Sequence, residues 1–320
     1  MNSVKDFPID VEEIRLWANG FKEENRLSWS KFAERCDLPS GTLQPFCKAN
    51  YAGDNDRIAR DLFRFRQTIE SKESHQQAIP VDPGYFETET SLRIRTLLQI
   101  AHMGRITVVA TGPGTGKDMT ALDYKDRAGA VWLVTMMKSC AKITPMVQQV
   151  QRTLSMDVRF GNMASSSRAV MERIRGRNGL LIINEAQHLV IDSFEEIRAW
   201  HDETGVGVCF MGNTDMLTRI ESGRQSDEFA RLNSRIAHRH LQPIPLREDV
   251  DTFCDAWGLR DPAIRQYLRK IALTQGSGGL RECRQLIEAG SMIARADERG
   301  LTVADLRDAQ SQRATRWIVA

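Results

Sequence analysis

A glycine-rich stretch ahead of a lysine is the part of this sequence best suited to chemistry. Residues 106–118 read ITVVATGPGTGKD. Glycines let successive backbone N–H groups turn into one concavity that binds anions, and a lysine beside them can reach the terminal phosphates of a nucleotide. The stretch therefore predicts a phosphate-binding loop (P-loop) for a nucleoside triphosphate. The residues of the predicted loop are Gly112, Pro113, Gly114, Thr115, Gly116, Lys117 and Asp118.

Two positions depart from the pattern G-x-x-x-x-G-K-[ST]. Thr111 stands at the first glycine, and Asp118 stands where a Ser or Thr hydroxyl normally binds Mg²⁺. The second departure matters more, because it places a carboxylate beside the predicted phosphates, where it is repulsive unless a cation lies between.

Further polar residues follow the predicted strands. Glu185 comes after the apolar run GLLIIN, and Asn213 comes after VCFMG. Ligands of open α/β sheets bind beyond the carboxyl ends of the strands, so Glu185 could polarise a water toward the γ-phosphate and Asn213 could orient that water. Arg231 and Arg235 could reach a phosphate in a neighbouring subunit, and Arg281 follows a glycine-rich break. Taken singly, each arginine could equally be a solvated surface charge.

Strands and helices that alternate would position these residues. Strands are expected at residues 106–109, 130–135, 179–184, 206–212 and, more weakly, 240–246, with helices at 88–103, 119–127, 143–154 and 165–177. Continuous apolar strands are typical of a parallel sheet covered on both faces, and the alternation indicates a doubly wound α/β domain. After Pro245 the pattern is helical to the end, with its main break at residues 276–279.

The N-terminal residues predict a separate helical domain. Helices are expected at residues 11–21, from Ser28 onward, at 40–50 and at 56–70. Residues 28–50 are similar to a helix-turn-helix, whose second helix can lie in the major groove of DNA. Pro45 fits that second helix if Thr42 is its N-cap, because Pro45 then lies in the first turn. A small helical bundle for protein contacts is the alternative.

Composition bounds the class of protein. The chain has 320 residues, 41% of them hydrophobic, and a net charge of only +2, so any nucleic-acid surface must be local. The six cysteines are scattered, which favours reduced thiols. The N-terminus lacks a basic-then-apolar signal, and no apolar run is long enough for a membrane span. We therefore expect a soluble, cytoplasmic protein with no membrane partner.

These motifs, in this order, carry a resemblance. The chain resembles AAA+ ATPases, and more closely the target-DNA-binding B transposition proteins of Mu-type phages. The segments that carry the resemblance are GTLQPFCKANYAGDNDR, VVATGPGTGKD, VWLVT, LLIINEAQHL, MGN, EFARLNSRIAHR and GGLRE. The resemblance covers nearly the whole chain, including the helix-turn-helix.

The resemblance implies a function and roles for residues. It implies ATP and Mg²⁺ as cofactors, nonspecific binding to double-stranded DNA as helical filaments in the bacterial host cytoplasm, and delivery of that DNA to a DDE transposase. The family's subunit interface completes its nucleotide site, so a homo-oligomer is also implied. By position Glu185 matches the Walker B glutamate, Asn213 sensor 1 and Arg281 sensor 2, and Arg235 matches the arginine finger, with Arg231 as second choice.

The departures from the family lie at the metal site. The family has Thr after the Walker A lysine and Asp before the Walker B glutamate, where this chain has Asp118 and Asn184. Mg²⁺ needs oxygen ligands, so one hypothesis is that Asp118 takes over the carboxylate role, with Asn184 as a neutral ligand acting directly or through water. The competing hypothesis is a degenerate site that binds ATP and hydrolyses it slowly or not at all.

The sequence also predicts domain boundaries and basic residues that contact DNA. We expect a helix-turn-helix domain at 1–72, a linker at 73–87, an AAA+ P-loop NTPase domain with a parallel sheet at 88–246, and a C-terminal helical lid at 247–320. An ATP-gated transcriptional regulator and a helicase loader are the alternative functions. The basic residues proposed to contact DNA phosphates are Lys138, Lys142, Arg159, Arg168, Arg173 and Arg175.

Overall fold

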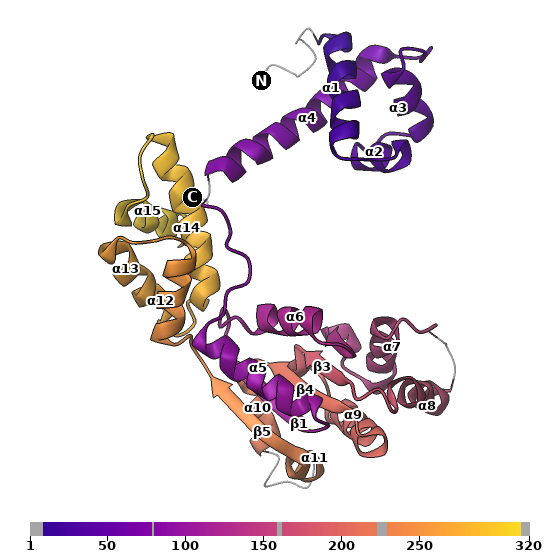
Figure 1. Ribbon diagram of the computed structural model, residues 1–320, viewed down its shortest axis with the longest axis vertical. Helices are drawn as coiled ribbons and strands as arrows, with labels where there is room; N and C mark the ends of the chain where they lie inside the picture. Colours follow the sequence, from indigo (N-terminus) through magenta and orange to yellow (C-terminus); the bar gives the residue numbers. More distant parts are fainter. Residues whose placement is uncertain (1–8, 79, 159–161, 223–228, 315–320) are drawn as a thin grey trace, which may run out of the picture. The chain divides into compact units, whose positions relative to one another are not determined.

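The computed structural model describes residues 9–78, 80–158, 162–222 and 229–314 (Figure 1). The chain divides into two compact units, Met1–Ile79 and Pro80–Ala320. The last helix of the first unit continues to Ala78, so the first residues of the expected linker 73–87 are helical.

The N-terminal unit is a small bundle of helices. Each helix contributes at least one side chain to its core, with Ile14, Phe32, Phe46 and Leu62 almost fully buried. The Ser28 hydroxyl accepts a hydrogen bond from the Lys31 N–H at 3.3 Å, which confirms the expected start of the second helix. The helices are α1 (Val11–Glu24), α2 (Trp29–Arg35), α3 (Ser40–Cys47) and α4 (Asn55–Ala78).

Helix α3 begins at Ser40, as expected, but its cap differs from the one we expected. Its N-cap is Pro39, in extended conformation, so the expected cap at Thr42 is wrong and Pro45 lies inside the helix. Proline at this position leaves the carbonyl of Gly41 without a helical donor. Gly41 is exposed, so water can satisfy that carbonyl, and this is why the short helix tolerates the proline.

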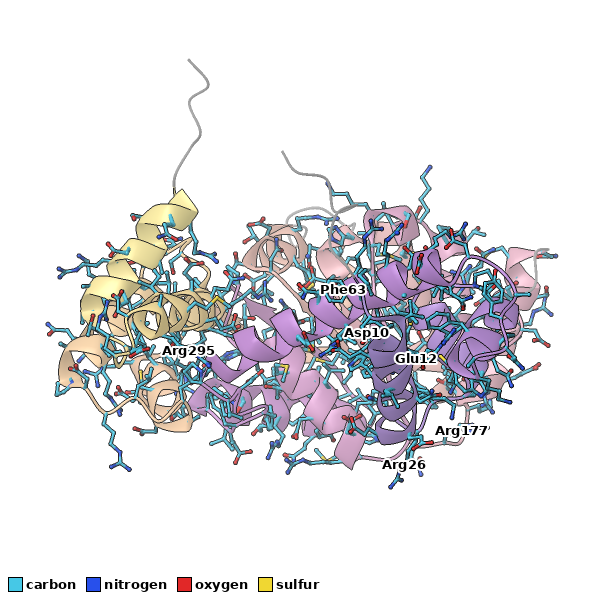
Figure 2. All side chains as sticks on the ribbon, turned by 90° about the horizontal axis from the view of Figure 1, so that it is seen from above. Asp10, Glu12, Arg26, Phe63, Arg177 and Arg295 are labelled. Carbon is cyan, nitrogen blue, oxygen red and sulfur yellow. The ribbon has the colours of Figure 1, made fainter. Side chains whose placement is uncertain are left out.

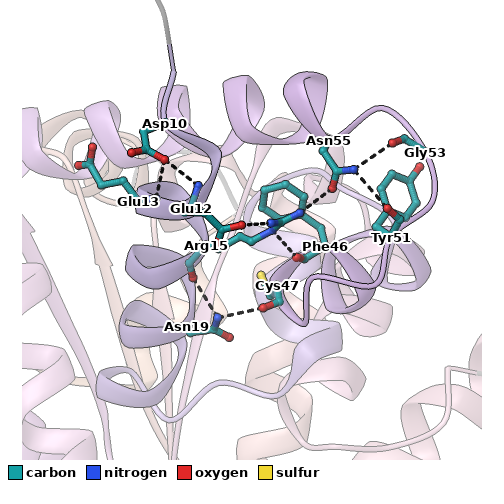
Figure 3. Close-up of polar contacts among 10 residues, drawn as sticks. All are labelled: Asp10, Glu12, Glu13, Arg15, Asn19, Phe46, Cys47, Tyr51, Gly53 and Asn55. Carbon is teal, nitrogen blue, oxygen red and sulfur yellow. Dashed lines mark hydrogen bonds and ion pairs between the residues drawn. The ribbon is translucent and has the colours of Figure 1, made fainter.

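Polar side chains of α1 bind the C-terminal end of α3 (Figure 3). The Arg15 guanidinium donates to the Phe46 carbonyl at 3.0 Å and to Asn55 Oδ1 at 2.9 Å. The Asn19 amide donates to the Cys47 carbonyl at 3.1 Å. These bonds add side-chain donors to carbonyls at a helix end, and they fix α3 against α1 and the start of α4.

The second unit is built on a five-stranded sheet within its described residues, in the order β2-β3-β4-β1-β5. Every neighbouring pair is parallel. Since β1 pairs with both β4 and β5, the loop that follows β1 emerges between these two strands at the carboxyl edge of the sheet. The strands are β1 (Ile106–Thr111), β2 (Val131–Thr135), β3 (Leu180–Asn184), β4 (Gly207–Gly212) and β5 (Ile236–Gln242).

Helices cover both faces of this sheet (Figure 1). Successive residues of β1 point to opposite faces, as strand geometry requires. Val109 packs in a cluster with Leu98 of α5 and Ala121 of α6, whereas Val108 packs in a cluster with Val147 of α7 and Phe194 of α9. The helices are α5 (Glu89–His102), α6 (Lys117–Arg127), α7 (Ile143–Thr153), α8 (Met163–Ile174), α9 (Ile191–Thr204), α10 (Thr214–Ser222) and α11 (Ala230–Arg235), with short 3₁₀ turns η2 (Lys138–Cys140) and η3 (Ala186–His188). The expected α/β architecture is therefore confirmed.

The position expected for the fifth strand is wrong. We expected it at residues 240–246, and it spans Ile236–Gln242. This strand lies at the edge of the sheet, where its side chains are mostly not buried, so no apolar run marks it. Pro243 follows at once and ends the strand, because proline cannot donate to the hydrogen-bond ladder.

The C-terminal residues form a helical subdomain with its own apolar cluster, as expected. Phe253, Leu268, Leu286 and Leu306 are buried in that cluster. Its helices are α12 (Arg247–Ala256), α13 (Pro262–Ala272), α14 (Gly279–Ala296) and α15 (Val303–Ala314). We refer to these four helices as the lid.

A buried carboxylate ties the lid to the α/β core. Asp249 of α12 is fully buried, and it accepts hydrogen bonds from the Thr90 N–H at 2.9 Å and the Leu246 N–H at 2.8 Å. The Thr90 hydroxyl also donates to Asp249 and accepts from the Gln242 amide at 2.6 Å. The acidic side chain therefore joins α12 to α5, and the Thr90 hydroxyl extends the network to β5.

The model also bears on membranes and thiols. Across the described residues, no helix combines the length and the apolar character needed to cross a bilayer. All six cysteines carry free thiols. Burial raises the pKa of Cys209 and of Cys283 to about 12, so these thiols are protonated and poorly reactive near neutral pH.

Candidate nucleotide-binding site

The P-loop lies between β1 and α6, as the sequence predicts, and close backbone approaches explain its glycines. A Cβ on Gly112 would lie 1.8 Å from the Pro243 carbonyl oxygen, and one on Gly114 would lie 1.9 Å from the Gly278 carbonyl oxygen. The Leu280 N–H donates to the Gly114 carbonyl at 3.0 Å. The loop is therefore held against β5 on one side and against the start of lid helix α14 on the other.

Thr111, the first departure from the motif, stabilises the loop. Its hydroxyl accepts a hydrogen bond from the Thr115 hydroxyl at 2.9 Å, and both residues are buried. Thr115 also donates to the Gly112 carbonyl at 3.1 Å, or shares its proton between the two acceptors. A side-chain contact across the loop thus accompanies the loss of the first consensus glycine.

Lys117 lies between two carboxylates at the carboxyl edge of the sheet. Its ammonium is 3.4 Å from Glu185 Oε1 and 3.7 Å from Asp118 Oδ2, and the residue is only 9% exposed. The predicted phosphate-binding lysine and the predicted catalytic carboxylate are therefore brought together. The ammonium is already held beside the P-loop, so it can bind a phosphate there without a large movement of the lysine side chain.

Asp118 and Asn184, the two residues of the metal-site departure, are in direct contact. The Asn184 amide donates to Asp118 Oδ1 at 2.9 Å. Arg281 of α14 also approaches, with its guanidinium 3.7 Å from Asp118 Oδ2. The predicted cofactor, metal and sensor 2 residues thus form one polar cluster.

Glu185 has an unusual backbone conformation. Its φ of 57° and ψ of 35° lie in the left-handed region, which non-glycine residues seldom adopt. Backbone strain of this kind recurs at functional sites, where the surroundings must hold it. Here the Gln187 amide donates to Glu185 Oε2 at 2.6 Å.

Gln187 also connects Glu185 to Asn213. Its Oε1 accepts from the Asn213 N–H at 3.3 Å. Asn213 Oδ1 in turn accepts from the Met216 N–H at 3.2 Å, so this side chain caps α10. Gln187 therefore connects Asn213 to Glu185 through one hydrogen bond to each residue. Our sequence reasoning missed Gln187.

Arg231 and Arg235 do not join this cluster. Arg235 donates to Asp202 of α9 at 3.0 Å, and both Arg231 and Arg235 are exposed. No ion pair or hydrogen bond connects either arginine to the P-loop of its own chain, as far as the structure describes the chain. Their expected role was toward a neighbouring subunit, and it stays a prediction.

A cavity of about 290 Å³ opens beside the P-loop. Its walls include Lys117, Asp118 and Arg281 together with aromatic side chains. Those aromatic residues are Tyr85, Phe86, Phe253 and Trp257. The ring centroids of Phe86 and Phe253 are 6.0 Å apart, and those of Phe253 and Trp257 are 5.7 Å apart. A cavity wall that combines charged and aromatic side chains is suited to the phosphates and the base of a nucleotide.

The aromatic wall was also missed from the sequence. Tyr85 and Phe86 lie in the segment interpreted as a linker, and Phe253 and Trp257 have the i, i+4 spacing of ordinary helix packing. The usable signal was the aromatic pair directly after Pro83-Gly84 in a polar stretch. Arg95 fixes Tyr85 by donating to its hydroxyl at 3.1 Å.

The residues present fit a magnesium ion that is shared with a nucleotide. Among the described residues there is no group of three or more His, Cys, Asp or Glu side chains that could hold a metal by itself. Asn184 Oδ1, however, is a buried oxygen without a hydrogen-bond partner, beside the Asp118 carboxylate. Mg²⁺ is commonly bound by one or two protein oxygens together with phosphates and waters.

The residues proposed for DNA contact differ in their surroundings. Lys138, Lys142 and Arg168 are exposed, whereas Arg175 donates to the Glu203 carbonyl at 2.9 Å. Arg173 is only partly exposed. Arg159 lies outside the described residues.

Comparison with known proteins gives matches to both parts of the second unit. The family model described as "AAA domain" matches residues 101–220, and the one described as "Mu B transposition protein, C terminal" matches residues 234–312. Among solved structures, the ORC2 protein of Aeropyrum pernix is similar with a TM-score of 0.53 at 16% identity, covering 72% of this chain and 68% of that one. This likeness supports the AAA+ fold.

Two curated relatives match over most of their length. The "ATP-dependent target DNA activator B" of Escherichia phage Mu is 30% identical over 287 residues, which cover 89% of this chain and 90% of the relative. The "Mu-like prophage FluMu DNA transposition protein B" of Haemophilus influenzae is 27% identical over 261 residues, which cover 81% of this chain and 89% of the relative.

Proposed function

The chain belongs to the Mu B family of transposition proteins, and from this membership we propose that it is an ATP-dependent DNA-binding protein that activates target DNA for transposition. The observation that carries the proposal is the polar cluster at the P-loop. Lys117, flanked by Glu185 and Asp118, lies in the wall of a cavity that aromatic side chains also line.

This chain's own residues divide the work of binding ATP. The P-loop N–H groups and Lys117 hold the phosphates, with the N-terminus of α6 adding its dipole. Aromatic residues of the cavity wall hold the base, and Arg281 of the lid neutralises phosphate charge. A Mg²⁺ bound by Asp118 and Asn184 would screen the phosphate charges. Glu185 orients a water for attack on the γ-phosphate, and Asn213 holds that water from the next strand.

DNA binding is proposed to depend on ATP and to show little sequence preference. Nonspecific binding needs basic side chains that follow the phosphates, so it weakens steeply with salt. Lys138, Lys142 and Arg168 are exposed, and so is Arg177, whose side chain is labelled in Figure 2. Exposed basic side chains such as these could contact DNA phosphates. The α2–α3 helix pair is proposed to add a second DNA contact from the N-terminal unit.

We also propose that bound subunits assemble into filaments and present the DNA to a DDE transposase. Arg235, or Arg231 in its place, would then reach the ATP of the adjacent subunit. Both arginines are exposed, which supports a role between chains rather than within one.

Co-sedimentation of the full chain with duplex DNA tests this function. We expect the protein to sediment with DNA of unrelated sequences in ATP or a nonhydrolysable analogue, and not in ADP. Lys117→Ala should abolish this, because it removes the phosphate-binding ammonium. Lys125→Ala is the matched control, since Lys125 is exposed on the same helix, and it should sediment as the unaltered protein does.

Two results would contradict the proposal. One is equal binding to DNA with and without nucleotide. The other is a discrete footprint on a single site, which would favour a transcriptional regulator.

A further inference from the structure

We propose that the carboxylate that binds the nucleotide's Mg²⁺ has moved in this chain from the end of β3 to the start of α6, onto Asp118, and that Asn184 has become its neutral partner. This inference rests on the proposed function, because it concerns the same nucleotide site.

The first support is that the exchange is reciprocal and that its members touch. P-loop proteins have a neutral hydroxyl after the lysine and a carboxylate at the end of the Walker B strand. This chain has the carboxylate at Asp118 and the neutral group at Asn184, joined by a 2.9 Å hydrogen bond. The site thus keeps one acidic and one neutral oxygen side chain, in exchanged places.

The second support is the state of the Asn184 side chain. This residue is only 7% exposed, and its Oδ1 has no hydrogen-bond partner. The bond from its amide nitrogen to Asp118 fixes which way the group points, because the opposite orientation would face two oxygens toward each other. A buried acceptor without a donor is costly. A cation, or water bound to one, would supply the missing partner.

The third support is the second oxygen of Asp118. Its nearest cationic groups, Lys117 and Arg281, are both 3.7 Å away, beyond ordinary hydrogen-bond distance. Among the described residues no hydrogen bond to this oxygen is found. The oxygen is therefore available to a metal, and Lys117 and Arg281 are left for phosphates.

Electrostatics then gives a consequence that can be measured. A triphosphate beside Asp118 is repelled by the carboxylate unless a divalent cation is bound by both. ATP binding by this chain should therefore depend strongly on Mg²⁺, and removal of the carboxylate should remove much of that dependence.

The experiment measures the affinity of the full chain for a fluorescent ATP analogue, in Mg²⁺ and in EDTA. In the unaltered protein EDTA should weaken binding strongly, because the carboxylate then repels the phosphates with no cation between them. Asp118→Asn, which keeps the shape of the side chain, should bind with nearly equal affinity in both conditions. The double variant Asp118→Asn with Asn184→Asp exchanges the two groups and should regain the Mg²⁺ dependence.

A second readout needs no catalysis. Mn²⁺ in place of Mg²⁺, followed by electron paramagnetic resonance, should show ATP-dependent immobilised Mn²⁺ in the unaltered and double variants and much less in Asp118→Asn. Thermal unfolding checks that each variant is folded. If Asp118→Asn does not fold, Asp118→Thr, which places the family's hydroxyl after the lysine, takes its place and should show the same loss of Mg²⁺ dependence.

The outcomes distinguish failure of the relocated carboxylate from failure of ATP binding itself. Mg²⁺ dependence and Mn²⁺ immobilisation unchanged in Asp118→Asn would overturn the relocated carboxylate and leave ATP binding intact. No binding of the analogue by the unaltered protein in either condition would instead overturn the proposed function itself.

Discussion

At the scale of single residues, the conformation of the P-loop depends on its contacts with neighbouring backbone as well as on its suitability for phosphate. Gly114 has a φ of 69°, and its α-carbon faces the Gly278 carbonyl so closely that a Cβ would lie 1.9 Å from the oxygen. Both the backbone conformation and the space therefore require glycine. The neighbouring atom is backbone, which cannot move aside as a flexible side chain can.

Gly114→Ala should therefore disturb both folding and nucleotide binding. We expect a loss of about 2 kcal/mol or more in the free energy of unfolding, from the left-handed conformation together with the clash. Urea denaturation and titration with a fluorescent ATP analogue measure the two effects. Gly129→Ala is the control, because a Cβ there meets nothing within 4 Å. Equal stability of the two variants would contradict the close approach.

Much of the candidate site could be predicted from residue types and their order. The P-loop, Glu185 and the linked change at Asp118 and Asn184 were all visible in the sequence, and the structure brings these residues together. Gln187 was not visible, because a single glutamine after a Walker B glutamate has no pattern of its own. Its role depends on β3 and β4 ending side by side, which only the folded sheet determines.

At the scale of elements, the lid is joined to the core by a buried polar network rather than by apolar packing alone. Asp249 accepts hydrogen bonds from Thr90 on α5 and from Leu246 at the start of α12. Gln242, at the end of β5, reaches the same threonine. Asp249 therefore joins α12 to α5 directly, and β5 joins the same network through Thr90.

Asp249→Ala should loosen this junction. The change leaves the Thr90 and Leu246 N–H groups without acceptors. We expect a loss of about 2–4 kcal/mol in the free energy of unfolding, because the hydrogen bonds to the carboxylate are lost and their donors stay buried without partners. Urea denaturation measures it. Glu248→Ala, at the exposed neighbouring position, should change stability by no more than about 0.5 kcal/mol. Similar losses in both variants would show that the network contributes little.

The elements themselves were predicted well where burial is strong and poorly where it is not. The buried strands β1, β3 and β4 have continuous apolar runs, and each is found within two residues of its expected range. The edge strand β5 has no such run and was placed too late in the chain. The start of α3 at Ser40 was predicted correctly, whereas the cap at Thr42, which we introduced to accommodate Pro45, is wrong.

At the scale of the whole molecule, we propose that Arg235 acts between chains. Arg235 donates to Asp202 of its own chain and remains about half exposed. A guanidinium that is exposed and held by only one carboxylate can exchange that partner for a phosphate of another subunit at small cost. Such an exchange is what the proposed role between chains requires.

Mixing two defective variants tests this. Lys117→Ala lacks the phosphate-binding group and Arg235→Ala lacks the proposed finger, so each alone should fail in ATP-dependent co-sedimentation with DNA. In an equal mixture about a quarter of head-to-tail interfaces combine an intact lysine with an intact arginine, so binding should partly return. Asp202→Ala, which removes only the in-chain partner of Arg235, should still sediment with DNA. A mixture no better than its components would contradict action between subunits.

The contact between the P-loop and the start of the lid has a consequence for recombination between relatives. The Leu280 N–H binds the Gly114 carbonyl, and a Cβ on Gly279 would lie 2.7 Å from the Pro113 carbonyl oxygen. The two segments are more than 160 positions apart in the chain, yet their backbones pack so closely that the shape of each depends on the other. A hybrid that joins the core of one phage protein to the lid of another should therefore inherit both segments from the same parent, wherever else the crossover falls.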